Sequence, residues 1–187
     1  MKKHLKLSRN SDGLLFQTMT KLTYIALGSN LGNQEVNLRL AAAELQKIST
    51  SPLVASSIWW STPEGFDEDV AAFCNAVVSL EVEIAAEALL VRLKKIEQKL
   101  GRARSEGGPY LSRIIDLDII DYDSRVLKTK VLELPHPRAV SRRFVLLPLQ
   151  EVSPGYHFPG VEHDLDTLIQ MAPENPMQKS ISLSPLG

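Results

Sequence analysis

The sequence is poor in cysteine, and this limits the kinds of protein it can be. Its 187 residues include a single cysteine, Cys74, so the chain cannot form an internal disulfide bond. A protein without disulfides suits a reducing compartment, and we expect a cytoplasmic location. Cys74 lies in the apolar stretch "FCNAVVSLEV", where a small buried hydrophobic residue is a better interpretation than a catalytic thiol.

The sequence also lacks an excess of charge and any long hydrophobic run. The formal net charge is −1, whereas a nucleic-acid-binding domain usually carries a strongly basic surface. No apolar stretch approaches the roughly 20 residues that cross a membrane. The "LLF" segment near the N-terminus is too short for the core of a signal peptide. We therefore expect neither nucleic acid nor membrane among the partners.

Familiar nucleotide-binding and catalytic signatures are absent as well. The stretch "ALGSNLGN" follows a predicted strand and precedes a predicted helix, but it contains neither G-K-[ST] nor G-x-G-x-x-G. By itself it is typical of a turn and a helix cap, with Asn33 as the N-cap residue. The sequence has no Cys/His cluster of the kind that binds zinc and no G-x-S-x-G motif.

Hydrophobic patterning predicts one α+β domain. Strand-like character is found at residues 22–29, 52–61, 73–84 and 113–121, and helical periodicity at residues 33–48 and 85–101. Gly101 is placed to end the second helix. The order β-α-β-β-α-β is that of a ferredoxin-like fold, with helices on one face of a largely antiparallel sheet. A hairpin is predicted after this core, at 121–127.

Both ends of the chain differ from this domain in composition. The first 18 residues are polar and show no periodicity, so residues 1–18 are predicted to be a disordered extension, with Met19 as the start of the functional protein. Residues 171–187 are predicted to be a loose tail for the same reason. The predicted domain therefore spans 19–170.

The segment "RIIDLDIID" combines the apolar character of a buried strand with acidic residues that strands usually exclude. Side chains two positions apart on a strand share a face, so Asp116 and Asp118 should point the same way and repel each other unless a positive group lies between them. Mg²⁺ suits such a pair, because it binds proteins through one or two carboxylates and completes its shell with phosphate and water.

Arginines surround the pair in sequence and suit phosphate oxygens: Arg102, Arg104, Arg113, Arg138, Arg142 and Arg143, with His136 among them. This combination favours phosphoryl transfer.

Each feature also has an ordinary structural explanation when it is taken alone. Two acids on a strand are often exposed edge residues, and arginines beside acids are usually surface pairs of little energetic weight. A histidine in "LPHPRAV" is often a turn residue. A different phosphotransferase would use the same metal and arginines, and a ligand-sensing or interaction module without catalysis would explain the fold but not the acidic and basic residues.

A set of longer motifs resembles one enzyme family. The motifs are "YIALGSNLGN", "TPEGF", "FCNAVVSLE", "LGRAR", "SRIIDLDII" and "LPHPRAVSRRFVLLPL", and they occur in family order over residues 22–168. Together they resemble 6-hydroxymethyl-7,8-dihydropterin pyrophosphokinase of folate biosynthesis. The resemblance implies the ferredoxin-like fold, ATP as co-substrate, two Mg²⁺ ions and a reduced pterin that receives the pyrophosphoryl group, with release of AMP. We also expect the chain to work as a monomer.

The resemblance further implies roles for individual residues on the nucleotide side. Asp116 and Asp118 are expected to bind the two Mg²⁺ ions, with Asp118 also near the attacking hydroxyl and therefore catalytic. The expected ATP-binding residues are Arg102, Arg113, His136, Arg142 and Glu97. Arg102 and Arg104 are expected to act in catalysis, Arg104 from a loop that closes over the nucleotide.

On the pterin side, the resemblance implies that Phe73 and Phe144 stack on the two faces of the heterocycle. Without it, core packing would be the better interpretation of both phenylalanines. Hydrogen bonds to the edge of the ring are expected from Thr62, Pro63, Gly65 and Asn75. The chain departs from the family in "SEGGPYLSR", which lacks the tryptophan of many members and offers Tyr110 instead, and in "TPEGF", where the commoner pattern is P-P-x-G.

Overall fold

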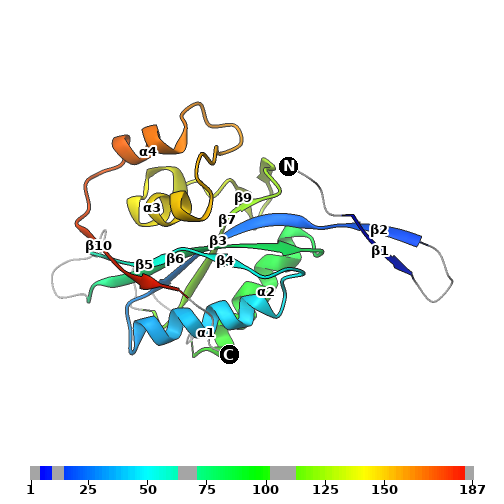
Figure 1. The fold of residues 1–187 in the computed structure, drawn as a ribbon, viewed down its shortest axis with the longest axis horizontal. Coiled ribbons are helices and arrows are strands. Elements are labelled where there is room, and N and C mark those ends of the chain that lie inside the picture. Colours follow the sequence, from blue (N-terminus) through cyan, green and yellow to red (C-terminus); the bar gives the residue numbers. More distant parts are fainter. Residues whose placement is uncertain (1–4, 10–14, 63–70, 102–112, 184–187) are drawn as a thin grey trace.

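The computed structural model describes residues 5–9, 15–62, 71–101 and 113–183. Its centre is an antiparallel sheet in the order β10-β5-β6-β3-β7, with the short β4 (Val54–Ala55) also paired to β6. The strands of the core are β3 (Lys21–Ser29), β5 (Ser57–Ser61), β6 (Phe73–Val82) and β7 (Asp116–Tyr122). With one helix after β3 and one after β6, these strands form the predicted ferredoxin-like arrangement (Figure 1).

Two long helices cover one face of this sheet. They are α1 (Gln34–Gln46) and α2 (Ala86–Lys99), and both lie below the sheet in Figure 1. As predicted, Asn33 caps α1, because its side-chain oxygen accepts the Val36 N–H at 3.2 Å. Gly101 follows α2 with φ +98°, a conformation that favours glycine. The apolar sides of both helices pack on Ile25, Leu27 and their neighbours to form the larger hydrophobic core.

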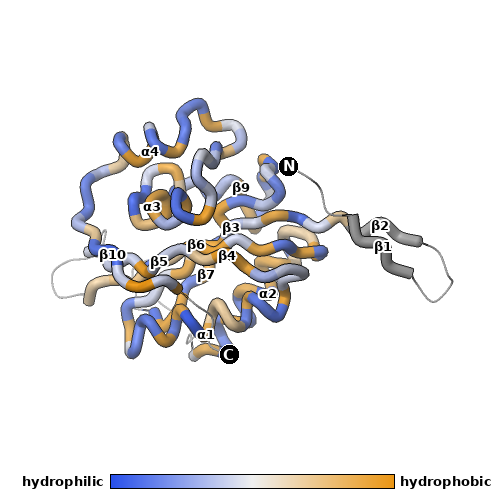
Figure 2. Tube along the Cα trace, viewed as in Figure 1, coloured by the Kyte–Doolittle hydropathy of each residue, from blue (hydrophilic) through white to orange (hydrophobic). Residues whose placement is uncertain are grey.

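Two further helices cover the opposite face, so the expectation of helices on one face only was incomplete. A 3₁₀ turn, η1 (Ala139–Ser141), leads into α3 (Arg143–Val152), and α4 (Leu165–Met171) packs beside α3. The physical reason is that β3 and β6 also carry apolar side chains on this second face, Tyr24 and Val77 among them, which a single helix layer would leave in water. Figure 2 shows hydrophobic residues (orange) in the sheet and in the helices of both layers.

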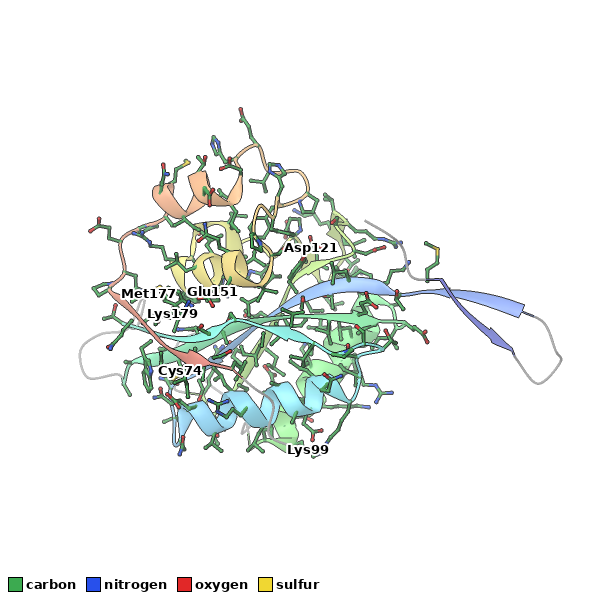
Figure 3. All side chains as sticks on the ribbon, in the orientation of Figure 1. Cys74, Lys99, Asp121, Glu151, Met177 and Lys179 are labelled. Carbon is green, nitrogen blue, oxygen red and sulfur yellow. The ribbon has the colours of Figure 1, made fainter. Side chains whose placement is uncertain are left out.

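Cys74 is buried on β6, in agreement with its sequence context. Its side chain is fully inaccessible, and burial raises the pKa of the thiol to about 12 (labelled in Figure 3). A thiol with such a pKa is not ionised near neutral pH and is a poor nucleophile.

The chain beyond β7 differs in detail from the prediction. A turn occurs within 121–127 as expected, with Asp123 and Ser124 in the left-handed region (φ 56° and 52°). The following strand β8 (Leu127–Lys128) pairs with β9 (Glu133–Leu134) rather than folding back on β7, so the predicted hairpin is only partly correct.

Both ends contain strands where the sequence predicted disorder or a loose tail. Near the N-terminus, β1 (Leu5–Arg9) pairs with β2 (Leu15–Met19) in a hairpin that projects from the domain in Figure 1. Near the C-terminus, β10 (Met177–Ser182) pairs with the edge of β5. Polar composition is misleading for β10, because pairing at a sheet edge uses main-chain groups and leaves most of its side chains in water.

Deleting residues 1–18 is expected to leave the melting temperature and the activity nearly unchanged. Within the described part of the chain, β1 and β2 pair only with each other, and a lone two-stranded hairpin adds little stability to a neighbouring domain. Thermal unfolding of the full and shortened chains tests this. A fall in melting temperature of roughly ten degrees would show that the segment packs on the domain.

Candidate active site

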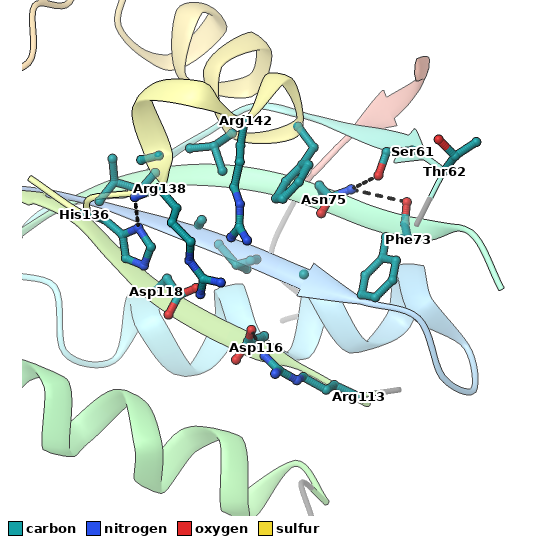
Figure 4. A pocket seen from close by; sticks show the side chains of 17 residues that line it. Ser61, Thr62, Phe73, Asn75, Arg113, Asp116, Asp118, His136, Arg138 and Arg142 are labelled. Atoms are coloured by element: carbon teal, nitrogen blue, oxygen red, sulfur yellow. Dashed lines mark hydrogen bonds and ion pairs between the residues drawn. The ribbon is translucent and has the colours of Figure 1, made fainter. Parts of the chain in front are cut away.

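One pocket opens beside the ends of β3, β6 and β7 and beneath the start of α3 (Figure 4). Its walls bring together residues that are far apart in sequence. The lining residues with polar or aromatic side chains are Ser61, Thr62, Phe73, Asn75, Arg113, Asp116, Asp118, His136, Arg138, Arg142 and Phe144. Nine residues to which the sequence assigned a role therefore meet in one place.

The acidic pair lies on the pocket side of β7. Asp116 and Asp118 both line the pocket, whereas Leu117 and Ile119 between and beyond them are buried in the core below the sheet, as strand alternation requires. Burial raises the pKa of Asp118, and the nearby Asp116 carboxylate raises it further, while His136, Arg113 and Arg138 oppose the shift. Asp116 forms an ion pair with Arg113, so one positive partner of the acids belongs to the chain itself.

Arg113 is held in place by the turn after β3. Its main-chain N–H donates to Asn30 Oδ1 at 2.6 Å, and the Asn30 N–H donates back to the Arg113 carbonyl at 3.0 Å. Asn30 is almost fully buried, so these bonds are shielded from water. The stretch "ALGSNLGN" thus does more than begin a helix, because it also anchors the segment that carries Arg113 and leads into the acidic pair.

His136 is fixed by a bulge in β7. Tyr24 pairs with Asp121 and Ile25 with Ile119, so Ile120 is an extra residue whose carbonyl accepts the His136 N–H at 2.8 Å. The ring Nδ1 accepts the Arg138 N–H at 3.2 Å, which assigns the proton of the neutral imidazole to Nε2. Burial lowers the pKa of His136, although the Asp118 charge opposes this shift. The imidazole ring is therefore neutral at neutral pH.

The two phenylalanines and Asn75 form a different kind of wall. Phe73 and Phe144 line the pocket and are only partly buried, and Phe144 also packs against the hydrophobic cluster of the second face. The Arg142 guanidinium lies 5.3 Å from the centre of the Phe144 ring. Asn75 is 5% exposed, and its Nδ2 donates to Ser61 Oγ at 2.9 Å (Figure 4). This wall offers flat apolar faces beside a fixed polar edge.

Glu97 is buried and bonds to the main chain of β7. It is not among the described residues that line the pocket, and its Oε1 accepts the N–H of Leu117 at 2.8 Å from the α2 side of β7. The motif match could not show on which side of the edge strand this carboxylate lies. Of the other expected site residues, Pro63, Gly65, Arg102 and Arg104 fall outside the described part of the chain, as does the loop expected to close over the nucleotide.

Two lining residues received no role from the sequence. Arg138 was noted as part of a basic group, and the structure places its guanidinium near Asp118 on the pocket wall (Figure 4). Its signal was the P-H-P-R motif, where proline rigidity keeps the histidine and the arginine close together. Ser61 had no sequence signal, because its importance comes from its hydrogen bond to Asn75 across two strands.

A second buried acid, Asp121, lies outside the pocket lining on the same strand. One carboxylate oxygen accepts from the Tyr156 hydroxyl and the other from the Ser124 N–H at 2.9 Å (Asp121 is labelled in Figure 3). Burial raises the pKa of Asp121 above its ordinary value of 3.8, although the Tyr156 hydrogen bond lowers it in part. The folded state therefore keeps this proton to higher pH than the unfolded state does.

Asp121→Asn should flatten part of the pH dependence of stability. In the unsubstituted chain, protonated Asp121 adds to the free energy of unfolding at low pH. It is lost as the pH rises from about 3.8 through the raised pKa, because the folded state then gives up its bound proton. The asparagine variant has no such proton, so its stability should fall less over this range. Urea unfolding from pH 4 to 6 measures this, with Glu162→Gln at an exposed position as the control. Parallel curves for Asp121→Asn and the parent chain would contradict it.

The pocket combines paired acids, cationic side chains and partly exposed phenylalanines on a ferredoxin-like sheet. This combination is typical of nucleotide-dependent transferases that act on a heterocycle. Comparison with known proteins narrows the class. Residues 24–154 match the model of the 7,8-dihydro-6-hydroxymethylpterin-pyrophosphokinase (HPPK) family. The chain therefore belongs to this family, whose reaction is pyrophosphoryl transfer to a pterin in folate biosynthesis.

Individual relatives agree with this assignment. The chain is 40% identical over 136 residues to the 2-amino-4-hydroxy-6-hydroxymethyldihydropteridine pyrophosphokinase of Bacillus subtilis, covering 72% of this chain and 79% of the relative. It is 38% identical to the enzyme of the same name from Porphyromonas gingivalis, covering 73% and 93%. It is also 38% identical to the folic acid synthesis protein fol1 of Pneumocystis carinii, covering 70% of this chain but 17% of that much longer protein.

The fold has solved counterparts too. A crystal structure of Plasmodium falciparum HPPK-DHPS superposes with a TM-score of 0.64 and 14% identity, covering 82% of this chain and 45% of that chain. At this identity the likeness concerns the fold alone, and it supports the ferredoxin-like class. Among the described residues, no helix is both long and apolar enough to cross a membrane.

Proposed function

We propose that the pocket around Asp116 and Asp118 is the active site for pyrophosphoryl transfer from ATP to 6-hydroxymethyl-7,8-dihydropterin. The observation that supports this best is the composition of the two walls. One wall holds two carboxylates among cationic side chains and His136, and the other holds partly exposed phenylalanines beside Asn75. A polyphosphate suits the first wall and a flat heterocycle with a polar edge suits the second.

The two carboxylates also suit Mg²⁺. Among the described residues, no three His, Cys, Asp or Glu side chains gather into a complete metal site. Mg²⁺ bound with a nucleotide does not need one, because phosphate oxygens and water supply the remaining ligands. We propose Asp116 and Asp118 as ligands of two Mg²⁺ ions. When bound, such ions neutralise charge on the triphosphate.

The cationic side chains would bind the triphosphate. Arg113 and Arg142 approach the pocket from different segments, and Arg138 lies between them near Asp118 (Figure 4). The Nε2–H of neutral His136 adds a donor without adding charge. In the transfer, the pterin hydroxyl oxygen bonds to the β-phosphorus, and the bond from that phosphorus to the α,β-bridging oxygen breaks. AMP leaves with the bridging oxygen, and the hydroxyl proton passes to a base, for which Asp118 is the best placed carboxylate.

The pterin would lie between Phe73 and Phe144, with its polar edge toward Asn75 and Thr62. Asn75 is buried and already held by Ser61, so its orientation is fixed before the ligand binds. A ring that left this amide unpaired would lose affinity, which gives selectivity for the pterin edge. We further propose that the chain acts as a monomer in the cytoplasm, which its single buried cysteine suits.

Incubation with ATP, Mg²⁺ and the reduced pterin tests the proposal and separates it from its alternatives. The proposed transfer produces AMP in equal amount to the pterin diphosphate. A different phosphotransferase using the same residues would produce ADP or no product, and a binding module would produce none. The absence of AMP from a folded, pterin-binding preparation would therefore contradict the proposed reaction.

A further inference from the structure

The C-terminal strand lies against the part of β5 that leads to the pocket. In β10, Met177 pairs with Ser61, Gln178 with Trp60 and Lys179 with Trp59. This strand follows the residues that match the family model, which end at 154. Figure 1 shows it crossing from the α4 side to the sheet edge. A segment outside the matched residues thus covers the outer edge of a strand that carries pocket residues.

Asn175, just before β10, contacts Thr62 through two hydrogen bonds. The Thr62 hydroxyl donates to Asn175 Oδ1 at 2.7 Å, and Asn175 Nδ2 donates to the Thr62 carbonyl at 3.3 Å. Thr62 is exposed, and it lines the pocket immediately after β5 ends. The paired bonds fix both the side chain and the peptide group of Thr62, which a single bond would not do.

A second contact holds β10 in register. The Glu151 carboxylate accepts the Ser57 N–H at 2.9 Å and the Trp59 indole N–H at 2.8 Å, and it forms an ion pair with Lys179 of β10 at 3.1 Å. Glu151 and Lys179 lie close together where α3 meets the sheet edge (Figure 3). The position of Asn175 is therefore set by a strand that is itself fixed to β5 and α3.

The pocket wall formed by Ser61 and Thr62 is consequently held from two sides. Asn75 holds Ser61 from inside the sheet, and Asn175 holds Thr62 from outside it. We propose that Asn175 is a positioning residue for the pterin: it orients Thr62 so that its polar groups meet the edge of the heterocycle. The inference rests on the proposed function, because it takes the pterin rather than ATP as the molecule that contacts Ser61 and Thr62.

Asn175→Ala tests the proposal, with Glu174→Ala, an exposed neighbour, as the matched control. Loss of both bonds should raise the KM for the pterin about three- to tenfold, the scale of one or two net hydrogen bonds. The KM for ATP and kcat should stay within about twofold of the parent values. The melting temperature should stay within about two degrees of that of the parent chain. An unchanged KM for the pterin, or an equal rise in both KM values, would overturn the proposal.

Substitutions of Thr62 distinguish positioning from a general loss of structure. Thr62→Ser keeps the hydroxyl and should therefore raise the KM for the pterin less than Thr62→Val, which removes it. Combined with Asn175→Ala, Thr62→Val should add less than its separate effect, because the two groups act through one contact. Fully additive effects would overturn the proposal. If the parent chain itself makes no AMP, the proposed function fails instead, and the two failures are thereby distinguished.

Discussion

Asp118→Asn is expected to lower turnover by a factor of about a thousand or more while the fold persists. The substitution keeps the shape of the side chain but removes the charge that would bind Mg²⁺ and accept the hydroxyl proton. Loss of several kcal/mol of transition-state stabilisation corresponds to such a factor. Asp116→Ala and Asp118→Ala should likewise abolish turnover. Steady-state AMP production by purified, folded variants is the measurement.

Asp123→Asn is the matched control for this prediction. It makes the same chemical change just after the same strand, but Asp123 is not among the described residues that line the pocket. It pairs with Lys21 and Arg125 in a turn at φ 56°, which asparagine tolerates well. Its turnover should stay within about twofold of the parent value. Because burial and Asp116 raise the pKa of Asp118, its charge is costly to the folded state, and Asp118→Asn should not lower stability at neutral pH. Near-normal turnover by folded Asp118→Asn would remove this residue from the proposed mechanism.

Arg142→Ala is expected to lower kcat/KM for ATP by roughly a hundredfold. Arg142 lies at the start of α3 with its guanidinium directed into the pocket, where it would form charge-assisted bonds to phosphate oxygens (Figure 4). Two such bonds together contribute on the order of 3 kcal/mol. Arg142→Lys keeps the charge but loses the planar fork, so it should recover only part of the activity.

The neighbouring Arg143 provides the control for Arg142. Arg143 is the first residue of α3 and is not among the described residues that line the pocket, so Arg143→Ala should change kcat/KM by less than about threefold. Pterin binding measured without ATP should also be little affected by Arg142→Ala. If both arginine variants lose activity equally, general charge near the pocket matters rather than the placement of Arg142.

The sequence predicted the central elements because their signals are local. The residues of β3 and β6 either alternate between apolar and polar or form an apolar run. The residues of α2 show helical periodicity, and Gly101 marks the end of this helix. The helix layer of α3 and α4 was missed because its position on the second face depends on which side of the sheet remains uncovered. β10 was missed because its polar residues pair through main-chain groups with a strand more than a hundred positions earlier.

The candidate site shows the same division. Alternation alone placed Asp116 and Asp118 on one face, and the resemblance to a known family supplied the rest of the predicted set. Neither source showed that Asn30 holds Arg113, or that a bulge at Ile120 exposes the carbonyl that holds His136. Such contacts join segments across the fold, so no single stretch of sequence contains them. The hydrogen bond from the Leu117 N–H to Glu97 is another contact of this kind.

The central position of β3 affects the chain while it is being synthesised. β3 is the first strand of the domain to be made, yet one of its edges pairs with the much later β7. In the turn after β3, Asn30 bonds to Arg113, which lies 83 positions further along the chain. At about 5–20 residues per second, the ribosome needs roughly 4–17 s to produce that partner. An unpaired strand edge can associate with other chains during this interval. The edge of β3 that pairs with β7 therefore stays open until β7 has left the ribosome.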